Sequence, residues 1–396
     1  MSHEMQVKQR WTSVAVVTPE AIEQKDLLIE GDRFAGLVSR DEATGADWQA
    51  VDGKGAILFP GMLDLLQHGF DVHLYCDTNA GAIAANSDLL LARGVTGFLP
   101  SIPCLPPGDL EGVLARLTAE CATARGARAI GVHSEGPCFG LPGAHNLANI
   151  QQPSRALAER MLAATDGTLA AVTIAPELPG AEDFIKTMKQ AGVSIHLGHS
   201  RALPQDVPRY VSWGIDAVTH MYNVMPTLPA DASGVHVMSL TDALLAEPGV
   251  ALGVICDGIH VHPQLIRLLA QLPADRVFLE TDANKYAGGE DNEFEFYPGY
   301  WVRSQRGNAV RDRNGGLCGS SLTSDEAMRN FVTFSGKGLV RAARAASLVP
   351  ARVIGREREL GSIEAGKLAD FVVLDPDALT VRQTIVGGQR LYGEAA

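Results

Sequence analysis

The sequence is poor in the features that mark secreted, membrane and nucleic-acid-binding proteins. Its 33 Lys and Arg are outnumbered by 46 Asp and Glu, and a net charge of −13 without a basic cluster disfavours a nucleic-acid partner. No apolar run approaches the roughly 18 residues that span a bilayer, and the opening stretch MSHEMQVKQRW has no apolar signal core. The six cysteines form no Cys-x-x-Cys pair, which argues against disulfides and a thiolate zinc site. We therefore expect a cytoplasmic protein that engages neither nucleic acid nor membrane.

The chain nevertheless carries enough apolar residues, 46%, for a sizeable core. Residues 1–57 and 356–396 alternate apolar and polar positions in short stretches that are broken by Gly, Asp and Pro, a pattern typical of β-strands and turns. Two β-rich ends around a different middle suggest that both ends build one domain. We predict a small β-sandwich from these two segments.

The middle of the chain, residues 58–355, has another rhythm. Short apolar runs alternate with longer helical patterns, which is typical of repeated βα units and a parallel sheet. Eight such units in about 300 residues fit an α/β fold of the (β/α)₈ TIM-barrel type, which we predict as a metal-dependent catalytic domain. The eight runs are residues 57–66, 94–102, 128–134, 169–176, 193–199, 216–220, 250–256 and 276–280.

Histidines and acids stand where these strands end, the place where barrel enzymes carry their chemistry. Glu135 follows the third run, His199 and His220 end the fifth and sixth, and Asp282 follows the eighth. Any one of them alone would more often be a satisfied polar residue or a helix cap. Together, one carboxylate and two imidazoles form an open three-ligand set typical of catalytic zinc. Asp282, across the barrel, could accept a proton from the water in the fourth position, which favours a metal-dependent hydrolase.

The same residues lie in motifs that follow one another along the whole chain. In these motifs the chain resembles the amidohydrolase superfamily and, within it, the N-acetylglucosamine-6-phosphate deacetylases. The motifs include Glu135-Gly136-Pro137, Gly143-Ala144-His145-Asn146, Gly198-His199-Ser200, Thr219-His220-Met221-Tyr222-Asn223, Thr281-Asp282-Ala283 and Gly361-Ser362-Ile363-Glu364-Ala365-Gly366.

The resemblance implies a role for each of these side chains. Glu135, His199 and His220 would hold one divalent metal ion, expected to be Zn²⁺. Asp282 would act as general acid and base, and His145 would polarise the scissile carbonyl. The implied reaction is deacetylation of a small N-acetylated amino sugar by metal-activated water. The resemblance also implies that Asn223 and His260 face the sugar phosphate and that the protein is a homodimer.

The chain departs from the family's pattern in three places. The loop from Glu135 to His145 is shorter than the family's, and the other two departures concern metal and phosphate. Many amidohydrolases carry His-x-His after the first strand for a second metal, but here the pair is Leu66 and His68. Leucine cannot bind a metal, so a full second site is doubtful, and we assign His68 to the substrate pocket. The family also carries an arginine, supplied by a neighbouring subunit, that reaches the substrate phosphate, and Asp231 stands where we align it. A carboxylate there repels phosphate, which predicts that a phosphorylated sugar is a poor substrate.

Alternatives stay open on the sequence alone. Arg303, Arg306 or Arg311, after the eighth strand, could supply the missing positive charge and restore a phosphorylated substrate. The enzyme could instead deacylate a non-phosphorylated N-acyl sugar or an N-acyl amino acid. A non-catalytic barrel that acts as a binding protein is a further alternative, which the complete ligand set disfavours.

Overall fold

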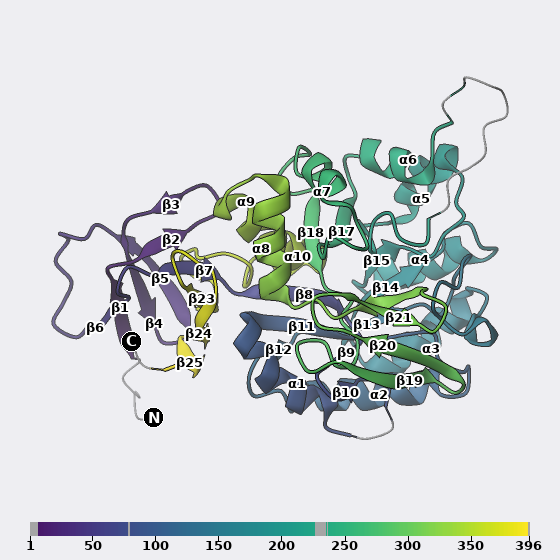
Figure 1. Ribbon diagram of the computed structural model, residues 1–396, viewed down its shortest axis with the longest axis horizontal. Coiled ribbons are helices and arrows are strands. Elements are labelled where there is room, and N and C mark those ends of the chain that lie inside the picture. Colours follow the sequence, from purple (N-terminus) through teal and green to yellow (C-terminus); the bar gives the residue numbers. More distant parts are fainter. Residues whose placement is uncertain (1–6, 78–79, 226–234, 236, 395–396) are drawn as a thin grey trace.

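The computed structural model describes residues 7–77, 80–225, 235 and 237–394, and its middle part is a barrel of eight parallel strands (Figure 1). Consecutive barrel strands pair in parallel from β8 through β11 to β18. The barrel closes beyond the end of β18, where Gln67 and Ala283 form a parallel bridge. The predicted (β/α)₈ fold is confirmed. The strands are β8 (Met62–Gln67), β11 (Val95–Ile102), β13 (Val132–Glu135), β14 (Leu169–Ile174), β15 (Ser194–Leu197), β16 (Ala217–Val218), β17 (Ala251–Ile255) and β18 (Val277–Glu280).

Helices cover the outside of the barrel (Figure 1). In α4, Phe184, Ile185 and Met188 face the core, whereas Glu182 and Lys186 pair on the solvent side. This apolar face at helical spacing is what holds each helix to the strands. The main helices are α1 (Ala82–Leu90), α2 (Leu110–Cys121), α3 (Arg155–Thr165), α4 (Ala181–Gln190), α5 (Val207–Trp213), α6 (Leu240–Ala246), α7 (Pro263–Leu269), α8 (Ser324–Ser335), α9 (Leu339–Ala343) and α10 (Val349–Val353).

Both ends of the chain meet in a separate pair of sheets, on the left in Figure 1. Trp11 and Phe371 meet edge to face in its core at a centroid distance of 5.2 Å, which ties the two ends together. The predicted additional β domain is therefore present. One sheet contains β1 (Lys8–Thr12), β4 (Asp26–Glu30), β5 (Arg33–Val38) and β6 (Gln49–Asp52); the other contains β2 (Ala15–Val17), β3 (Ile22–Glu23), β7 (Ile57–Pro60), β23 (Phe371–Leu374), β24 (Val381–Val386) and β25 (Gln389–Tyr392).

The first apolar run of the sequence, residues 57–66, forms two strands rather than one. Strand β7 pairs with β2 and β23 in the terminal domain, whereas β8 starts the barrel. Gly61 lies between them, where a Cβ would come within 2.1 Å of Thr96 Oγ1. Both strands are almost entirely buried, so no alternation of polar residues separates them in the sequence. The domain limits at residues 57, 58, 355 and 356 stay a prediction.

A four-stranded antiparallel sheet follows β18, where the sequence suggested only a loop. It packs through Phe294, Val302 and Val310 on Leu74 of β10 (His73–Leu74), the strand that pairs with β9 (Gly69–Phe70). This contact places the sheet beside the carboxyl ends of the barrel strands. Its strands are β19 (Asn292–Tyr297), β20 (Tyr300–Ser304), β21 (Ala309–Asp312) and β22 (Leu317–Ser320).

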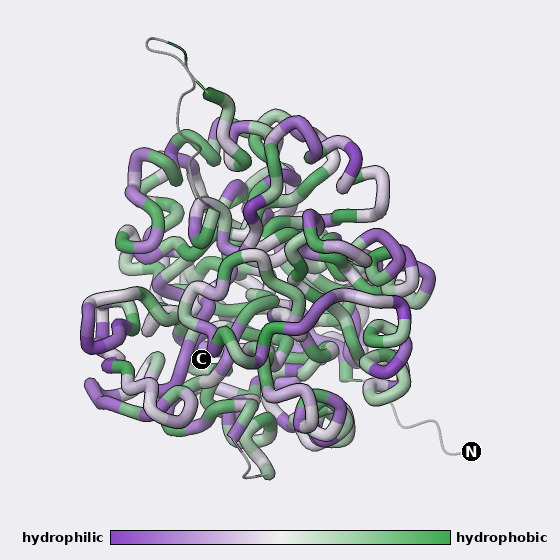
Figure 2. The backbone as a smooth tube through the Cα atoms, turned by 90° about the vertical axis from the view of Figure 1, so that its right-hand side faces the viewer, coloured by the Kyte–Doolittle hydropathy of each residue, from purple (hydrophilic) through white to green (hydrophobic). Residues whose placement is uncertain are grey.

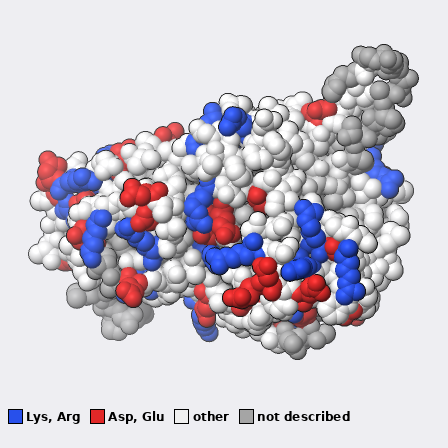
Figure 3. Space-filling view, in the orientation of Figure 1, with Lys and Arg blue, Asp and Glu red and all other residues white. Residues whose placement is uncertain are grey.

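Charge and hydropathy follow this architecture. Figure 2 shows hydrophobic stretches through the middle of the molecule and hydrophilic ones at many outer turns. On the face in Figure 3, Lys and Arg are interspersed with Asp and Glu. In the described ranges, no helix is long and apolar enough to cross a bilayer. The six cysteines are all free thiols.

Candidate metal centre and active site

Three predicted metal ligands meet at the carboxyl ends of the barrel strands. Glu135 ends β13, while His199 and His220 follow β15 and β16. The Nε2 atoms of His199 and His220 lie 3.2 and 3.0 Å from Glu135 Oε1 and 3.1 Å from each other. All three side chains are buried, and one ligand atom from each lies within 4.8 Å of the others. One carboxylate and two imidazoles that converge in this way are the donor set that catalytic zinc favours.

His199 is oriented for metal binding by contacts on the far side of its ring. Its Nδ1 lies 3.0 Å from the carbonyl oxygen of Leu141. Because a carbonyl oxygen can only accept, Nδ1 carries the proton and Nε2 turns a lone pair toward Glu135. Phe139 stacks on the ring at a centroid distance of 4.1 Å. Burial lowers the pKa of His199 to about 4, so the ring is neutral at pH 7, the form that binds a metal.

His220 and Glu135 form a charged pair in the metal-free protein. Burial lowers the pKa of His220, but the hydrogen bond and the negative charge of Glu135 outweigh burial and raise it to about 9. Burial favours protonation of Glu135, yet the electrostatic interaction with His145 and hydrogen bonds from the neighbouring histidines hold its pKa well below the ordinary value. A metal ion that binds His220 must therefore displace a proton at neutral pH.

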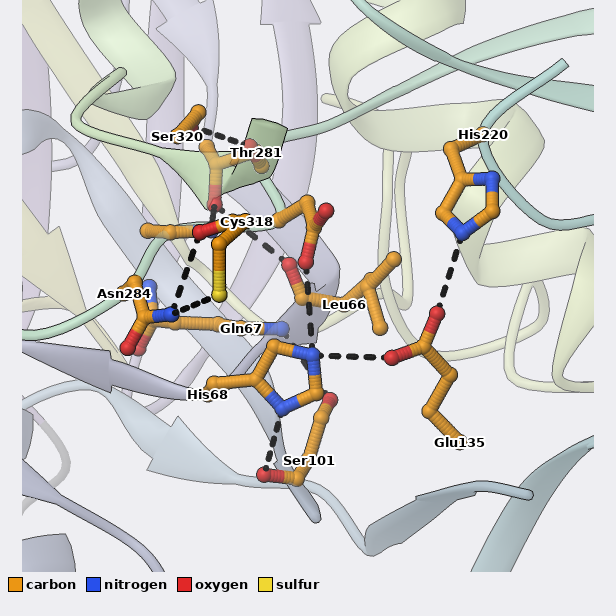
Figure 4. A network of polar contacts seen from close by, with 12 residues as sticks. Leu66, Gln67, His68, Ser101, Glu135, His220, Thr281, Asn284, Cys318 and Ser320 are labelled. Atoms are coloured by element: carbon orange, nitrogen blue, oxygen red, sulfur yellow. Dashed lines mark hydrogen bonds and ion pairs between the residues drawn. The ribbon is translucent and has the colours of Figure 1, made fainter. Parts of the chain in front are cut away.

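A second cluster lies on the other oxygen of Glu135, around His68. The Nε2 of His68 is 2.9 Å from Glu135 Oε2 (Figure 4). The same nitrogen is 3.3 Å from Asp282 Oδ1. These three residues also have ligand atoms within 4.8 Å of one another. Burial lowers the pKa of His68, but hydrogen bonds to Asp282 and Glu135 outweigh burial and raise it to about 10. His68 thus lies between two carboxylates, and the fully buried Leu66 adds no donor atom. This cluster offers one imidazole where the first offers two, so it matches the zinc donor set less well.

His145 presents a proton to the same centre. The backbone N–H of Cys104 donates to His145 Nδ1 at 3.2 Å. Because Nδ1 accepts this hydrogen bond, the ring proton lies on Nε2, which is 3.2 Å from Glu135 Oε2. Gly143 lets the loop approach, since a Cβ there would stand 2.9 Å from His199 Cε1. An N–H aimed at the metal centre can donate to the oxygen of a carbonyl bound there.

The backbone around Asp282 is held by buried groups to which the sequence analysis gave no role. Asp64 Oδ2 accepts a hydrogen bond from the hydroxyl group of Thr281 at 2.6 Å. Asp64 Oδ1 accepts one from the backbone N–H of Thr281 at 3.2 Å. Ser320 donates to the carbonyl oxygen of Thr281 at 2.5 Å (Figure 4). Burial raises the pKa of Asp64 to about 6. These contacts hold the strand exit that carries Asp282.

Glu280 is another buried acid that sequence reasoning missed. It ends β18, two residues before Asp282, and its side chain is 1% exposed. Burial raises the pKa of Glu280 to about 8. Its only sequence signal is a charged residue at the end of the apolar run 276–280, where an exposed cap is the commoner role.

A cavity of about 160 Å³ opens over the metal centre and contains the predicted substrate contacts. His68, His145, Asn223 and His260 all line it. Asn223 Nδ2 donates to the carbonyl oxygen of His260 at 3.3 Å, and His260 Nδ1 lies 2.6 Å from an oxygen of Asp257. The geometry therefore brings these side chains to one pocket, and their roles toward a substrate stay predictions.

The basic side chains that most often bind phosphate, Lys and Arg, are missing from the described lining of this cavity. Within the described ranges its lining contains no Lys or Arg, so Arg303, Arg306 and Arg311 do not line it. The antiparallel sheet of β19 to β22 contributes the apolar side chains Phe296 and Leu317 to the cavity wall. Asp231, the predicted substitute for a phosphate-binding arginine, lies outside the described residues.

Comparisons with known proteins agree with this geometry. The amidohydrolase family model matches residues 135–391. The chain is 35% identical over 300 residues to the N-acetylgalactosamine-6-phosphate deacetylase of Escherichia coli O157:H7, covering 75% of this chain and 78% of that protein. It is 30% identical over 393 residues to the N-acetylglucosamine-6-phosphate deacetylase of Bos taurus, covering 97% and 95%.

Solved structures extend the likeness to the whole fold. The N-acetylglucosamine-6-phosphate deacetylase of Pasteurella multocida has a TM-score of 0.88 at 26% identity, covering 97% of this chain and 99% of that one. The corresponding enzyme of Mycobacterium smegmatis has a TM-score of 0.87 at 26% identity, covering 98% and 100%. The chain therefore belongs to the amidohydrolase family, among its N-acetylglucosamine-6-phosphate deacetylases, and is a hydrolase of amide bonds.

Proposed function

We propose that this enzyme releases acetate from an N-acetylated amino sugar at the cavity above Glu135, His199 and His220. The observation that carries the proposal is the convergence of these three ligand atoms beside a general acid–base candidate, Asp282. A divalent ion held there, which we propose to be Zn²⁺, would lower the pKa of a water molecule and polarise the amide carbonyl.

The chain's own residues supply the remaining steps. Asp282, an acceptor at the cavity wall, removes a proton from the attacking water as the new C–O bond forms. His145 Nε2–H donates to the carbonyl oxygen, where negative charge develops. Asp282 then returns its proton to the sugar nitrogen as the C–N bond breaks. The proton that Asp282 gains is the one it gives, so the products are acetate and the free amino sugar.

We further propose that the preferred sugar carries no phosphate. The described cavity lining has no Lys or Arg, and residues 226–236 contain none in the sequence. A phosphate dianion needs charge-assisted hydrogen bonds to offset its desolvation. Asn223 and His260 can instead bind the hydroxyl groups of a neutral hexosamine. The relatives are named for phosphorylated substrates, so this selectivity would set the present enzyme apart from them.

The cellular setting and assembly belong to the same proposal. Six free thiols suit a reducing compartment, and we place the enzyme in the cytoplasm. We propose a homodimer because the resemblance implies one. The mass in solution, measured by light scattering, tests this assembly.

A substrate screen tests the function itself. Zinc-loaded enzyme is mixed with N-acetylglucosamine, N-acetylgalactosamine, their 6-phosphates and an N-acetyl amino acid, and acetate release is followed. We expect release from an N-acetylhexosamine. No release from any sugar, with release from the amino acid, would move the enzyme to the N-acyl amino acid class. Protein that binds no zinc and releases no acetate would favour a binding protein.

A further inference from the structure

Glu280 contacts the metal centre from below, although it takes no part in the mechanism above. One of its oxygens, Oε1, accepts the backbone N–H of His220 at 2.5 Å. The side chain reaches across from β18 to the end of β16, so it links two strand exits of the barrel. It belongs to neither group of potential metal ligands in the described chain. Its contact is with the main chain of a ligand residue.

The backbone of His220 needs such support. His220 has φ of +33°, in the left-handed region that side chains with a Cβ rarely adopt. Strand β16 has only two residues, Ala217 and Val218, so the ladder that could hold its exit is short. The amides on either side of His220 donate to backbone carbonyls, Thr219 to Leu197 and Met221 to Gly253. The His220 amide alone among these three donates to a side chain.

The neighbouring strand makes room for this side chain. Gly253 lies in β17, where a Cβ would stand 2.5 Å from Glu280 Oε1. The same Cβ would stand 2.7 Å from Phe278 Cζ, so a larger residue at 253 would displace both the Glu280 carboxyl group and that ring. Gly253 and Glu280 thus form a complementary pair on adjacent strands.

We propose that Glu280 is a positioning residue for the metal centre: its hydrogen bond to the His220 amide fixes the backbone that aims His220 Nε2 at Glu135. This inference rests on the proposed metal site. A buried amide that loses its acceptor moves to find another, and His220 would then relax from its left-handed conformation. Groups that orient a metal ligand typically contribute about 10–100-fold to metal affinity, and we expect the same range here.

The test measures zinc affinity, by chelator competition, in metal-stripped protein. Glu280→Gln keeps a carbonyl oxygen that can accept the hydrogen bond from the His220 amide. We therefore expect its zinc affinity to be near that of the wild type. Glu280→Leu keeps the approximate volume without an acceptor, and we expect affinity about 10–100-fold weaker. The matched control is Glu120→Leu, which removes a buried glutamate of α2 that pairs with Arg116 at 3.0 Å, on the outer helix layer. It should lower stability without changing zinc affinity.

Each outcome bears on the proposal. Zinc affinity in Glu280→Leu equal to that of the wild type would overturn it, and so would equal weakening in the Gln and Leu variants. If Glu280→Leu does not fold, Gly253→Ala takes its place, because the added methyl group crowds Glu280 Oε1. Unchanged zinc affinity there would also overturn the proposal. Wild-type protein without zinc affinity would instead refute the metal centre itself, which separates the two failures.

Discussion

Replacing Asp282 by Asn should nearly abolish turnover while leaving the metal in place. The change removes the group that carries a proton from water to the leaving nitrogen, because an amide cannot accept a proton at neutral pH. Asp282 is not one of the three main ligands. Those are Glu135, through its Oε1 atom, and the two histidines whose Nε2 atoms lie beside that oxygen. Its nearest charged contact is His68 Nε2 at 3.3 Å, and Asn can still accept a hydrogen bond from that ring. The fold and zinc content should therefore survive.

The expected loss follows from the role. General acid–base catalysis contributes about 10²–10⁴-fold, and each tenfold corresponds to about 1.36 kcal/mol of activation free energy. The substitution should thus raise the barrier by about 3–5 kcal/mol. Since the same carboxyl group serves two proton transfers, we expect a loss at the upper end of this range.

The assay compares kcat for acetate release with the zinc content of the same preparation. Asp257→Asn is the matched control, because Asp257 is a partly buried acid at the neighbouring exit of β17 that contacts His260 rather than the metal centre. It should change mainly KM. A kcat for Asp282→Asn within tenfold of the wild type, at full zinc content, would refute the assignment and shift attention to His68 as the proton carrier.

Three further results are expected. His199→Ala and His220→Ala should each lose zinc and acetate release together, because two protein ligands rarely hold zinc tightly; one full equivalent of zinc in both variants would exclude this ligand set. In metal-free protein the pKa of His220 is raised to about 9, so a proton competes with zinc below that pH. The apparent zinc affinity should therefore rise about tenfold per pH unit from 7 to 9 and then level off, whereas a profile flat across this range would contradict the charged pair. Finally, kcat/KM should be higher for an N-acetylhexosamine than for its 6-phosphate, and a clear preference for the phosphate ester would restore a phosphate-binding site.

The barrel and the convergence of the three candidate metal ligands could be predicted from the sequence because both follow from where apolar runs end. Parallel strands place their carboxyl ends on one face of the barrel. Glu135, His199 and His220 therefore meet in space although up to 85 residues separate them. No knowledge of the loops is needed for this inference.

Other features depend on contacts that no local pattern records. Strands β7 and β8 are both almost fully buried, so the run 57–66 shows no period that would divide it. Glu280 accepts a hydrogen bond from a backbone amide at another strand exit. Every residue except proline has such an amide, so the sequence does not indicate which one is the partner. The sheet from β19 to β22 is held by a small apolar cluster with Leu74, more than 200 residues earlier in the chain.

The most direct test of the metal centre is titration of metal-stripped enzyme with zinc while acetate release from an N-acetylhexosamine is followed. With Glu135, His199 and His220 as one complete ligand set, and Leu66 in place of a further ligand, activity should be absent without metal and reach its plateau at one equivalent. Full activity in metal-free enzyme, or a plateau only at two equivalents, would contradict the account.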